Sequence, residues 1–239
     1  MATRPYEQRA RAEEAERTRM RIIEAVFTRL REAPAERVAI DQVAHMAGVA
    51  RSTVYAIFGS RSGLFDAVGR ELAARSGYAR LLDAKHQPDA REHLRAGFRA
   101  ASEMLAANRD IYRALRSMAQ LDEQAVGGVV RRMDEERGRG MARLVGRLAE
   151  QGVLREGLSL EDAEHVLWVL TSFESFDALY TGRGLSTDRA VELLVDTAER
   201  ALYAGRSRVR GGRASAATPI QRPRGSTQSS SGPRNEMFG

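Results

Sequence analysis

The chain of 239 residues contains no cysteine, one tryptophan and six prolines. Without cysteine it can form neither a disulfide framework nor a thiolate zinc site, and a cysteine nucleophile is excluded. No uninterrupted apolar run approaches the roughly 20 residues that a membrane-spanning helix needs. The N-terminal segment, MATRPYEQRARAEEAER, is charged throughout and has no apolar signal core. We therefore expect a cytoplasmic protein with no membrane partner.

Sequence motifs of the common enzyme classes are also missing. The chain contains no G-x-S-x-G elbow, phosphate-binding loop or dinucleotide fingerprint. No two histidines have a ligand spacing with a carboxylate that would indicate a metal site. The four histidines are His45, His86, His93 and His165. We predict no catalytic residue, no metal site and no cofactor.

What the sequence does contain is typical of an all-α protein. Ala, Leu, Arg and Glu dominate from Tyr6 to Tyr203, and the alternating apolar and polar runs that indicate strands are scarce. Apolar residues at helical spacing predict a first amphipathic helix that ends before Pro34. These residues are Met20, Ile23, Phe27 and Leu30. Further helices are predicted at about 40–47, 51–58, 61–75, 88–108, 109–120, 123–151, 159–180 and 186–203.

Residues 38–65 predict a helix-turn-helix, the motif that presents a recognition helix to the DNA major groove. Small apolar side chains on the first helix let the second one cross closely, and Gly48 supplies a tight turn that a side chain would obstruct. Val49, Val54 and Phe58 then face back toward the first helix of the chain. The crossing leaves four side chains on the outer side: Arg51, Ser52, Thr53 and Tyr55. The alternative is an ordinary pair of packed helices.

This segment resembles the TetR (tetracycline repressor) family of one-component bacterial regulators. The matching residues are Ile22-Ile23-Glu24-Ala25, Val43-Ala44, Ala47-Gly48-Val49, Ser52-Thr53-Val54-Tyr55, Phe58, Ser60-Arg61 and Leu64-Phe65. They cover about residues 18–75 with no insertion, and beyond Arg75 only the number and length of the helices fit. The resemblance implies a three-helix helix-turn-helix DNA-binding domain at 18–75, preceded by an N-terminal extension at 1–17. A helical-bundle domain for regulation and dimerisation would follow at 76–204.

The resemblance also implies which residues meet double-stranded DNA. They are Arg51 and Thr53 at base edges or adjacent phosphates, Ser52 and Tyr55 at phosphate or a thymine methyl, and Ser60 with Arg61 at the start of the next helix. The chemistry agrees with these roles. Arginine pairs bidentately with guanine, hydroxyls bond phosphate, and a helix N-terminus attracts an anion.

For residues 76–204 the resemblance implies an internal cavity for a small molecule and a homodimer joined through about 159–203. Aromatic, methionine and a few polar side chains are typical walls for an apolar or aromatic effector. The candidates are Met104, Tyr112, Met118, Trp168, Ser172 and Phe176. The alternative for each is plain core or dimer interface. Glu174 and Asp177 would either orient a cationic effector or pair with arginine.

These observations predict a dimeric repressor that binds an inverted repeat and is released by a small effector. One alternative is a DNA-binding regulator whose helical domain meets a partner protein and takes no effector. Another is a helical enzyme or carrier that matches the family by chance. The many positions in register argue against that second alternative.

The formal charge of +6 has a different origin from the motif. Residues 1–75 carry 13 basic and 10 acidic side chains, and residues 76–204 carry 18 and 21. Residues 205–239 carry seven arginines and one glutamate, so the whole excess equals that of this Gly/Ser/Pro/Arg-rich segment. We expect the segment to be disordered because it has little apolar surface to bury. It would either add nonspecific attraction to phosphate or serve only as a solubilising extension.

Overall fold

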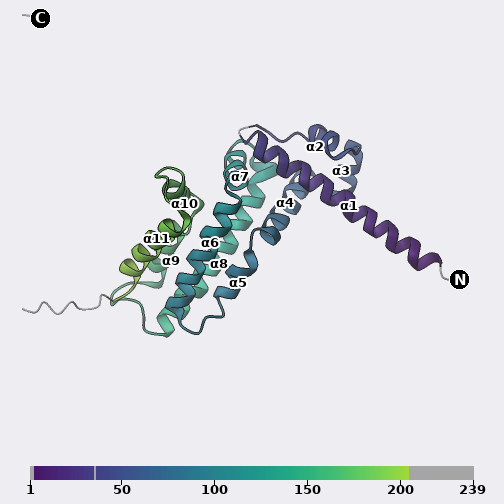
Figure 1. Ribbon diagram of the computed structural model, residues 1–239. Helices are drawn as coiled ribbons and strands as arrows, with labels where there is room; N and C mark the ends of the chain where they lie inside the picture. The colour runs from purple at the N-terminus through teal and green to yellow at the C-terminus, as the bar shows by residue number, and fades with distance from the viewer. Residues whose placement is uncertain (1–2, 35, 205–239) are drawn as a thin grey trace, which may run out of the picture. The chain divides into compact units, whose positions relative to one another are not determined.

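The computed structural model describes residues 3–34 and 36–204, and these form an all-α protein (Figure 1). The described part contains no strand, and its one β-bridge joins Leu154 to Tyr203. None of its helices is long and apolar enough to cross a membrane. The prediction of disorder for 205–239 concerns residues outside the described ranges.

Four helices make up the N-terminal part. They are α1 (Thr3–Glu32), α2 (Ile40–Ala47), α3 (Arg51–Phe58) and α4 (Arg61–Arg75). The predictions for α2, α3 and α4 are confirmed at both ends. Helix α1 continues through the residues that were assigned to an N-terminal extension, so the extension and the first predicted helix form one element of 30 residues.

Seven further helices and one π-helical turn, η1, follow. They are α5 (Tyr78–Ala84), α6 (Ala90–Ala107), α7 (Arg109–Leu121), η1 (Glu123–Gly127), α8 (Gly128–Glu150), α9 (Leu160–Leu170), α10 (Phe173–Tyr180) and α11 (Thr187–Leu202). Helix α6 packs on α5, α8 and α11, while α9 packs on α8 and α11. Figure 1 shows α5, α6 and α8 running alongside one another.

The prediction of one helix over 159–180 is wrong, because the chain divides it into α9 and α10. Ser172 stands between them in an extended conformation, and its hydroxyl accepts a hydrogen bond from the Ser175 amide at 3.1 Å. This cap starts a new helix inside an apolar stretch that looks continuous in sequence. Helix α5 was not predicted at all.

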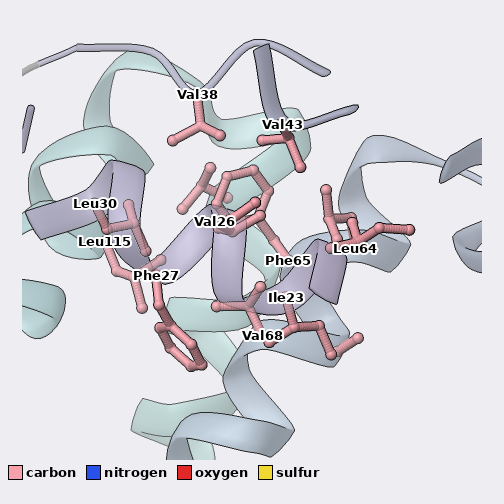
Figure 2. Close-up of a cluster of buried hydrophobic side chains, with 14 of the residues drawn as sticks. Ile23, Val26, Phe27, Leu30, Val38, Val43, Leu64, Phe65, Val68 and Leu115 are labelled. Atoms are coloured by element: carbon pink, nitrogen blue, oxygen red, sulfur yellow. The ribbon is translucent and has the colours of Figure 1, made fainter. Parts of the chain in front are cut away.

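One apolar cluster joins the N-terminal helices to the bundle (Figure 2). Its members come from α1, from the α1–α2 connection, from α2 to α4, and from α7, η1 and α8. The residues labelled in Figure 2 are Ile23, Val26, Phe27, Leu30, Val38, Val43, Leu64, Phe65, Val68 and Leu115. The helix-turn-helix and the bundle therefore share a core.

A second cluster lies within the bundle. It includes Leu94 and Phe98 of α6, Val145 and Leu148 of α8, Leu167 of α9, and Leu194 and Leu202 of α11. A smaller third cluster surrounds Phe173 and Phe176 of α10. The second and third clusters lie within the bundle alone. The first cluster is therefore the one that connects the predicted helix-turn-helix to the bundle.

Helices α4 and α8 cross closely at Gly69. A Cβ atom at this position would lie 2.3 Å from the Cγ2 atom of Val129, well inside van der Waals contact. Val129 is itself buried in the shared core. The crossing therefore requires a residue without a side chain, since interiors packed at this density resist added volume.

We predict that Gly69→Ala lowers the free energy of unfolding by about 1–3 kcal/mol, because the added methyl group separates α4 from α8. The control is Gly97→Ala in α6, where a Cβ would meet nothing within 4 Å. That change should raise stability by about 0.5–1 kcal/mol through helix propensity. Urea unfolding of both variants measures the difference, and a stabilised Gly69→Ala would contradict the tight crossing.

Candidate nucleic-acid interface

The turn between α2 and α3 has the geometry that the sequence predicts. Gly48 adopts a left-handed conformation, with φ of 65°, which favours glycine. Its amide donates to the His45 carbonyl at 3.1 Å, and the Val49 amide donates to the Ala44 carbonyl at 3.0 Å. Val54 is buried in the shared core. This packing fixes which side of α3 faces outward.

The outer side of α3 presents polar and aromatic groups. Arg51, Ser52 and Tyr55 are exposed, and Thr53 is partly exposed. Ala50, which precedes the helix, provides no side-chain cap. The first amides of α3 therefore find no hydrogen-bond acceptor on that side chain, and the helix N-terminus offers donors to an anion. Four of the predicted DNA-contacting residues thus share one accessible surface.

Arg51 is held by two neighbours. Its Nη1 atom donates to both carboxylate oxygens of Asp41 in α2, at 3.0 and 2.9 Å. Its Nη2 atom donates to the Tyr55 hydroxyl at 3.4 Å, and its Cζ atom lies 5.6 Å from the centre of the Tyr55 ring. All three side chains remain accessible, so the arrangement is a surface network.

The hydroxyl of Ser60 caps α4. It accepts a hydrogen bond from the Gly63 amide at 3.0 Å and lies 2.9 Å from the Ser62 hydroxyl. A contact between Ser60 and DNA stays a prediction. The cap itself stabilises the start of the helix by about 1 kcal/mol.

Arg61 points toward the bundle in this structure. Its Nη2 atom donates to the Val38 carbonyl at 3.0 Å, and its Nη1 atom forms an ion pair with Asp122. Asp122 precedes η1, is 8% exposed, and also accepts from the Ala125 amide at 3.3 Å. Arg61 therefore ties the start of α4 to the bundle, and its predicted phosphate contact stays a prediction.

Opposing effects act on the pKa of the Asp122 carboxyl. Burial by itself would raise the pKa, but hydrogen bonding and positive charge from Arg61 lower it, with smaller contributions from the Ala125 amide and Arg37. The net pKa is below its ordinary value of 3.8. Asp122 is consequently ionised at neutral pH, and the pair with Arg61 is fully charged.

Solved structures share this arrangement of helices, although no family model and no curated protein matches the chain. NalD, the secondary repressor of the MexAB-OprM multidrug efflux pump in Pseudomonas aeruginosa, is 22% identical; the match covers 80% of this chain and 98% of NalD, with a TM-score of 0.61. The chain has the fold of TetR-family regulators.

Two further structures carry the same fold. The ketosteroid transcriptional regulator KstR2 of Mycobacterium tuberculosis is 16% identical, with 78% of this chain and 95% of KstR2 covered and a TM-score of 0.58. A TetR family transcription regulator from Marinobacter aquaeolei VT8 is 16% identical, with 81% and 98% covered and a TM-score of 0.59. Each match covers about four fifths of this chain and nearly all of the other protein.

Within this TetR-type bundle, the six predicted effector-contacting residues fall in separate places. Met118 is buried in the shared core, while Met104, Tyr112 and Phe176 belong to the third cluster around α10. Ser172 caps α10, and Trp168 is 41% exposed. These placements do not bring the six into one lining, and their role in effector binding stays a prediction.

Trp168 lies at a surface hollow of about 330 Å3 between α8 and α9. The hollow is lined by Gly138, Met141, Glu164, His165 and Trp168. The Cζ atom of Arg137 lies 3.7 Å from the centre of the indole ring, and its Nη1 atom donates to the Trp168 carbonyl at 2.7 Å. The cation–π contact holds the indole in place.

The predicted alternatives for Glu174 and Asp177 are resolved by their partners. Asp177 pairs with Arg109 at 2.9 Å and with Arg113 at 2.5 Å, and Glu174 pairs with Arg116 at 3.2 Å. Both carboxylates therefore pair with arginine. Within residues 3–34 and 36–204, no group of three or more histidine, aspartate or glutamate side chains is placed to hold a metal ion.

Sequence reasoning missed Asp41 and Asp122, the two carboxylates that hold Arg51 and Arg61. Asp122 stands before a helical segment, which is a cap signal that the sequence does contain. Its pairing with Arg61 joins residues 61 positions apart, and no local pattern marks it. Asp41 and Arg51 lie on opposite sides of the Gly48 turn, so their proximity follows only from the helix crossing.

We predict that Asp122→Asn lowers the free energy of unfolding at pH 7 by about 2 kcal/mol, because it leaves Arg61 without its ionised partner. The asparagine side-chain oxygen can still accept a hydrogen bond from the Ala125 amide, so the cap of η1 is kept. The folded pKa of Asp122 is depressed, so the wild-type advantage is present above pH 3.8 and is lost as pH falls through the folded pKa. Denaturant unfolding at several pH values measures this.

The matched control is Glu13→Gln in α1, which breaks an ion pair with Arg9 in which both side chains are more than half exposed. It should change stability by less than about 0.5 kcal/mol, since exposed pairs contribute little. Equal effects of the two substitutions would show that Asp122 is not a special link between α4 and the bundle.

Proposed function

We propose that the chain is a cytoplasmic, ligand-responsive DNA-binding regulator that acts as a homodimer and represses transcription from an inverted-repeat operator. The observation that carries this proposal is the outer side of α3, where Arg51, Ser52, Thr53 and Tyr55 project from an accessible helix N-terminus in a TetR-type fold. In a dimer, two such helices would read half-sites roughly 34 Å apart or a multiple of that distance.

Electrostatics support this assignment modestly. Residues 1–75 carry a net charge of +3, whereas residues 76–204 carry −3. Contacts with phosphate are favoured by the first segment and disfavoured by the second. The N-terminal part is thus the part suited to a polyanion, in agreement with the position of α3.

Exposed apolar side chains on α9 support a dimer that uses residues 159–203. Leu160 and Val169 are 50% and 59% exposed, although each is a large apolar residue. Helix α11 buries Leu194 and Leu202 in its own chain and leaves Thr197 exposed. A second copy would cover these groups, as expected for a two-fold interface.

The shared core and the Arg61–Asp122 pair support coupling between effector and DNA. Helix α4 contacts α1 and α3 on one side and α8 and η1 on the other. An effector that favours a different arrangement of the bundle would therefore move α4 and change the spacing of the two recognition helices. The change in DNA affinity would be limited by the difference in the effector's affinity for the two conformers.

A second candidate function is a DNA-binding regulator whose bundle binds a partner protein and no small molecule. The complete burial of Met118 and Phe176 favours it, since these predicted effector contacts already fill core clusters. The hollow beside Trp168 favours the effector, because its volume suits a small molecule with apolar and polar walls. A screen of small molecules for a rise in the melting temperature of the chain would distinguish the two candidate functions, because only an effector-binding bundle should respond.

We predict that Arg51→Ala weakens binding to a specific duplex about tenfold or more, since a bidentate arginine–guanine contact contributes on the order of 1–3 kcal/mol. Genomic fragments captured by the full chain supply the duplex, and gel-shift titration measures the affinity. The control is Arg70→Ala, which removes the same charge from an exposed position on α4. Capture of no specific fragment, or equal affinities for Arg51→Ala and the unaltered chain, would contradict the proposal.

We predict that Val169→Lys converts the dimer to a monomer, because it places two charges in an apolar interface. Leu82→Lys is the control, because Leu82 is also an exposed apolar residue, at 38%, but lies on α5 outside the proposed interface. Analytical ultracentrifugation measures the mass of each variant. A dimer that survives Val169→Lys unchanged would place the interface elsewhere.

A further inference from the structure

We propose that Asp41 is a positioning residue for base recognition, holding the Arg51 guanidinium so that its free edge meets a guanine in the major groove. The proposal rests on the proposed function and adds a specificity-determining residue to it. Asp41 belongs to α2, the helix that crosses α3, and it lies outside the set of residues expected to touch DNA.

The geometry leaves one edge of Arg51 available. A guanidinium has five N–H donors in a planar fork. Asp41 occupies Nη1 through both of its oxygens, and the Tyr55 hydroxyl takes one hydrogen of Nη2 at 3.4 Å. Among the described residues, the Nε atom donates no hydrogen bond. Because the Tyr55 contact is long at 3.4 Å and Nη2 carries two hydrogens, the Nε–Nη2 edge can make a bidentate contact with guanine O6 and N7.

The two holding contacts come from different directions. Asp41 binds the end of the guanidinium from α2, while the Tyr55 ring lies 5.6 Å from the Cζ atom and belongs to the next turn of α3. A long flexible side chain is thus fixed before DNA arrives. Such preorganisation improves affinity and discrimination because less rotamer freedom is lost when the complex forms.

Asp41 affects DNA affinity in two opposite ways, because its charge repels phosphate while its hold on Arg51 favours a base contact. The carboxylate is 70% exposed and carries a negative charge beside the recognition helix. It therefore weakens binding to any phosphate backbone while it strengthens the contact between Arg51 and one base. A purely structural surface ion pair would not separate specific from nonspecific affinity in this way.

The test compares two affinities for each variant of the full chain. Duplexes selected from random-sequence DNA by the unaltered chain define the operator, and the guanine read by Arg51 is the one at which Arg51→Ala loses discrimination. For each variant, the dissociation constant is measured for this operator and for the same duplex with that G·C pair replaced by A·T. The ratio of the two constants is the readout.

We expect Asp41→Asn to lower this ratio about threefold, the size that an exposed pair can contribute, while binding to an unrelated duplex stays equal or becomes tighter. In an Arg51→Ala background the same substitution should leave the ratio unchanged. The control, Glu36→Gln, also removes one negative charge from the N-terminal part, and Glu36 pairs with Arg29 rather than Arg51. It should tighten binding to all duplexes alike and keep the ratio.

Circular dichroism and the unfolding midpoint show whether Asp41→Asn remains folded, as an exposed pair predicts. An unchanged ratio in folded Asp41→Asn would overturn the inference and leave the proposed function standing. A further change of the ratio when Asp41→Asn is added to Arg51→Ala would also overturn it, because Asp41 would then act without Arg51. Selection of no sequence by the unaltered chain would overturn the proposed function and this inference together.

Discussion

Burial of a single apolar cluster between the N-terminal helices and the bundle is the interaction on which the rest of the structure depends. Helices α2 and α3 have eight residues each, too few to be stable alone. They are held because Val43 and Val54 pack onto α1 and α4, which in turn pack on Leu115 and Val129 of the bundle. The orientation of α3, and with it the accessible surface that carries Arg51, follows from that packing.

The helix-turn-helix could be predicted from sequence because its signals are local. Gly48, the small residues before it and Val54 after it lie within one short segment, and the structure confirms the turn and the faces. The division between α9 and α10 was missed, because an apolar run hides the cap that Ser172 makes. The pairs Arg51–Asp41 and Arg61–Asp122 could not be predicted, since each depends on how separate helices cross.

The position of the charged side chains supports DNA binding by α3 better than the net charge of the chain does. The exposed arginines near the start of α1 have glutamates close by on the same helix, as in the pairs Arg9–Glu13 and Arg17–Glu14. Residues 9–17 therefore carry three arginines and three glutamates and no net charge. The charge of residues 205–239 equals the whole positive excess, so the proposed sequence-specific role would rest on a few side chains of α3 and not on the net charge.

The shared core also limits how freely the two halves of the chain can be exchanged with those of related folds. A chimera that carried only residues 18–75 would expose Ile23, Phe27 and Phe65 to a foreign bundle surface. The transplant would have to include the bundle side chains that complete the cluster. These are Ile111, Ala114, Leu115, Met118, Ala125, Val126 and Val129. If such chains exchange parts in evolution, α7, η1 and the first turn of α8 would have to move together with helices α1 to α4. The point at which one protein could be joined to another therefore lies inside the bundle and not at residue 75.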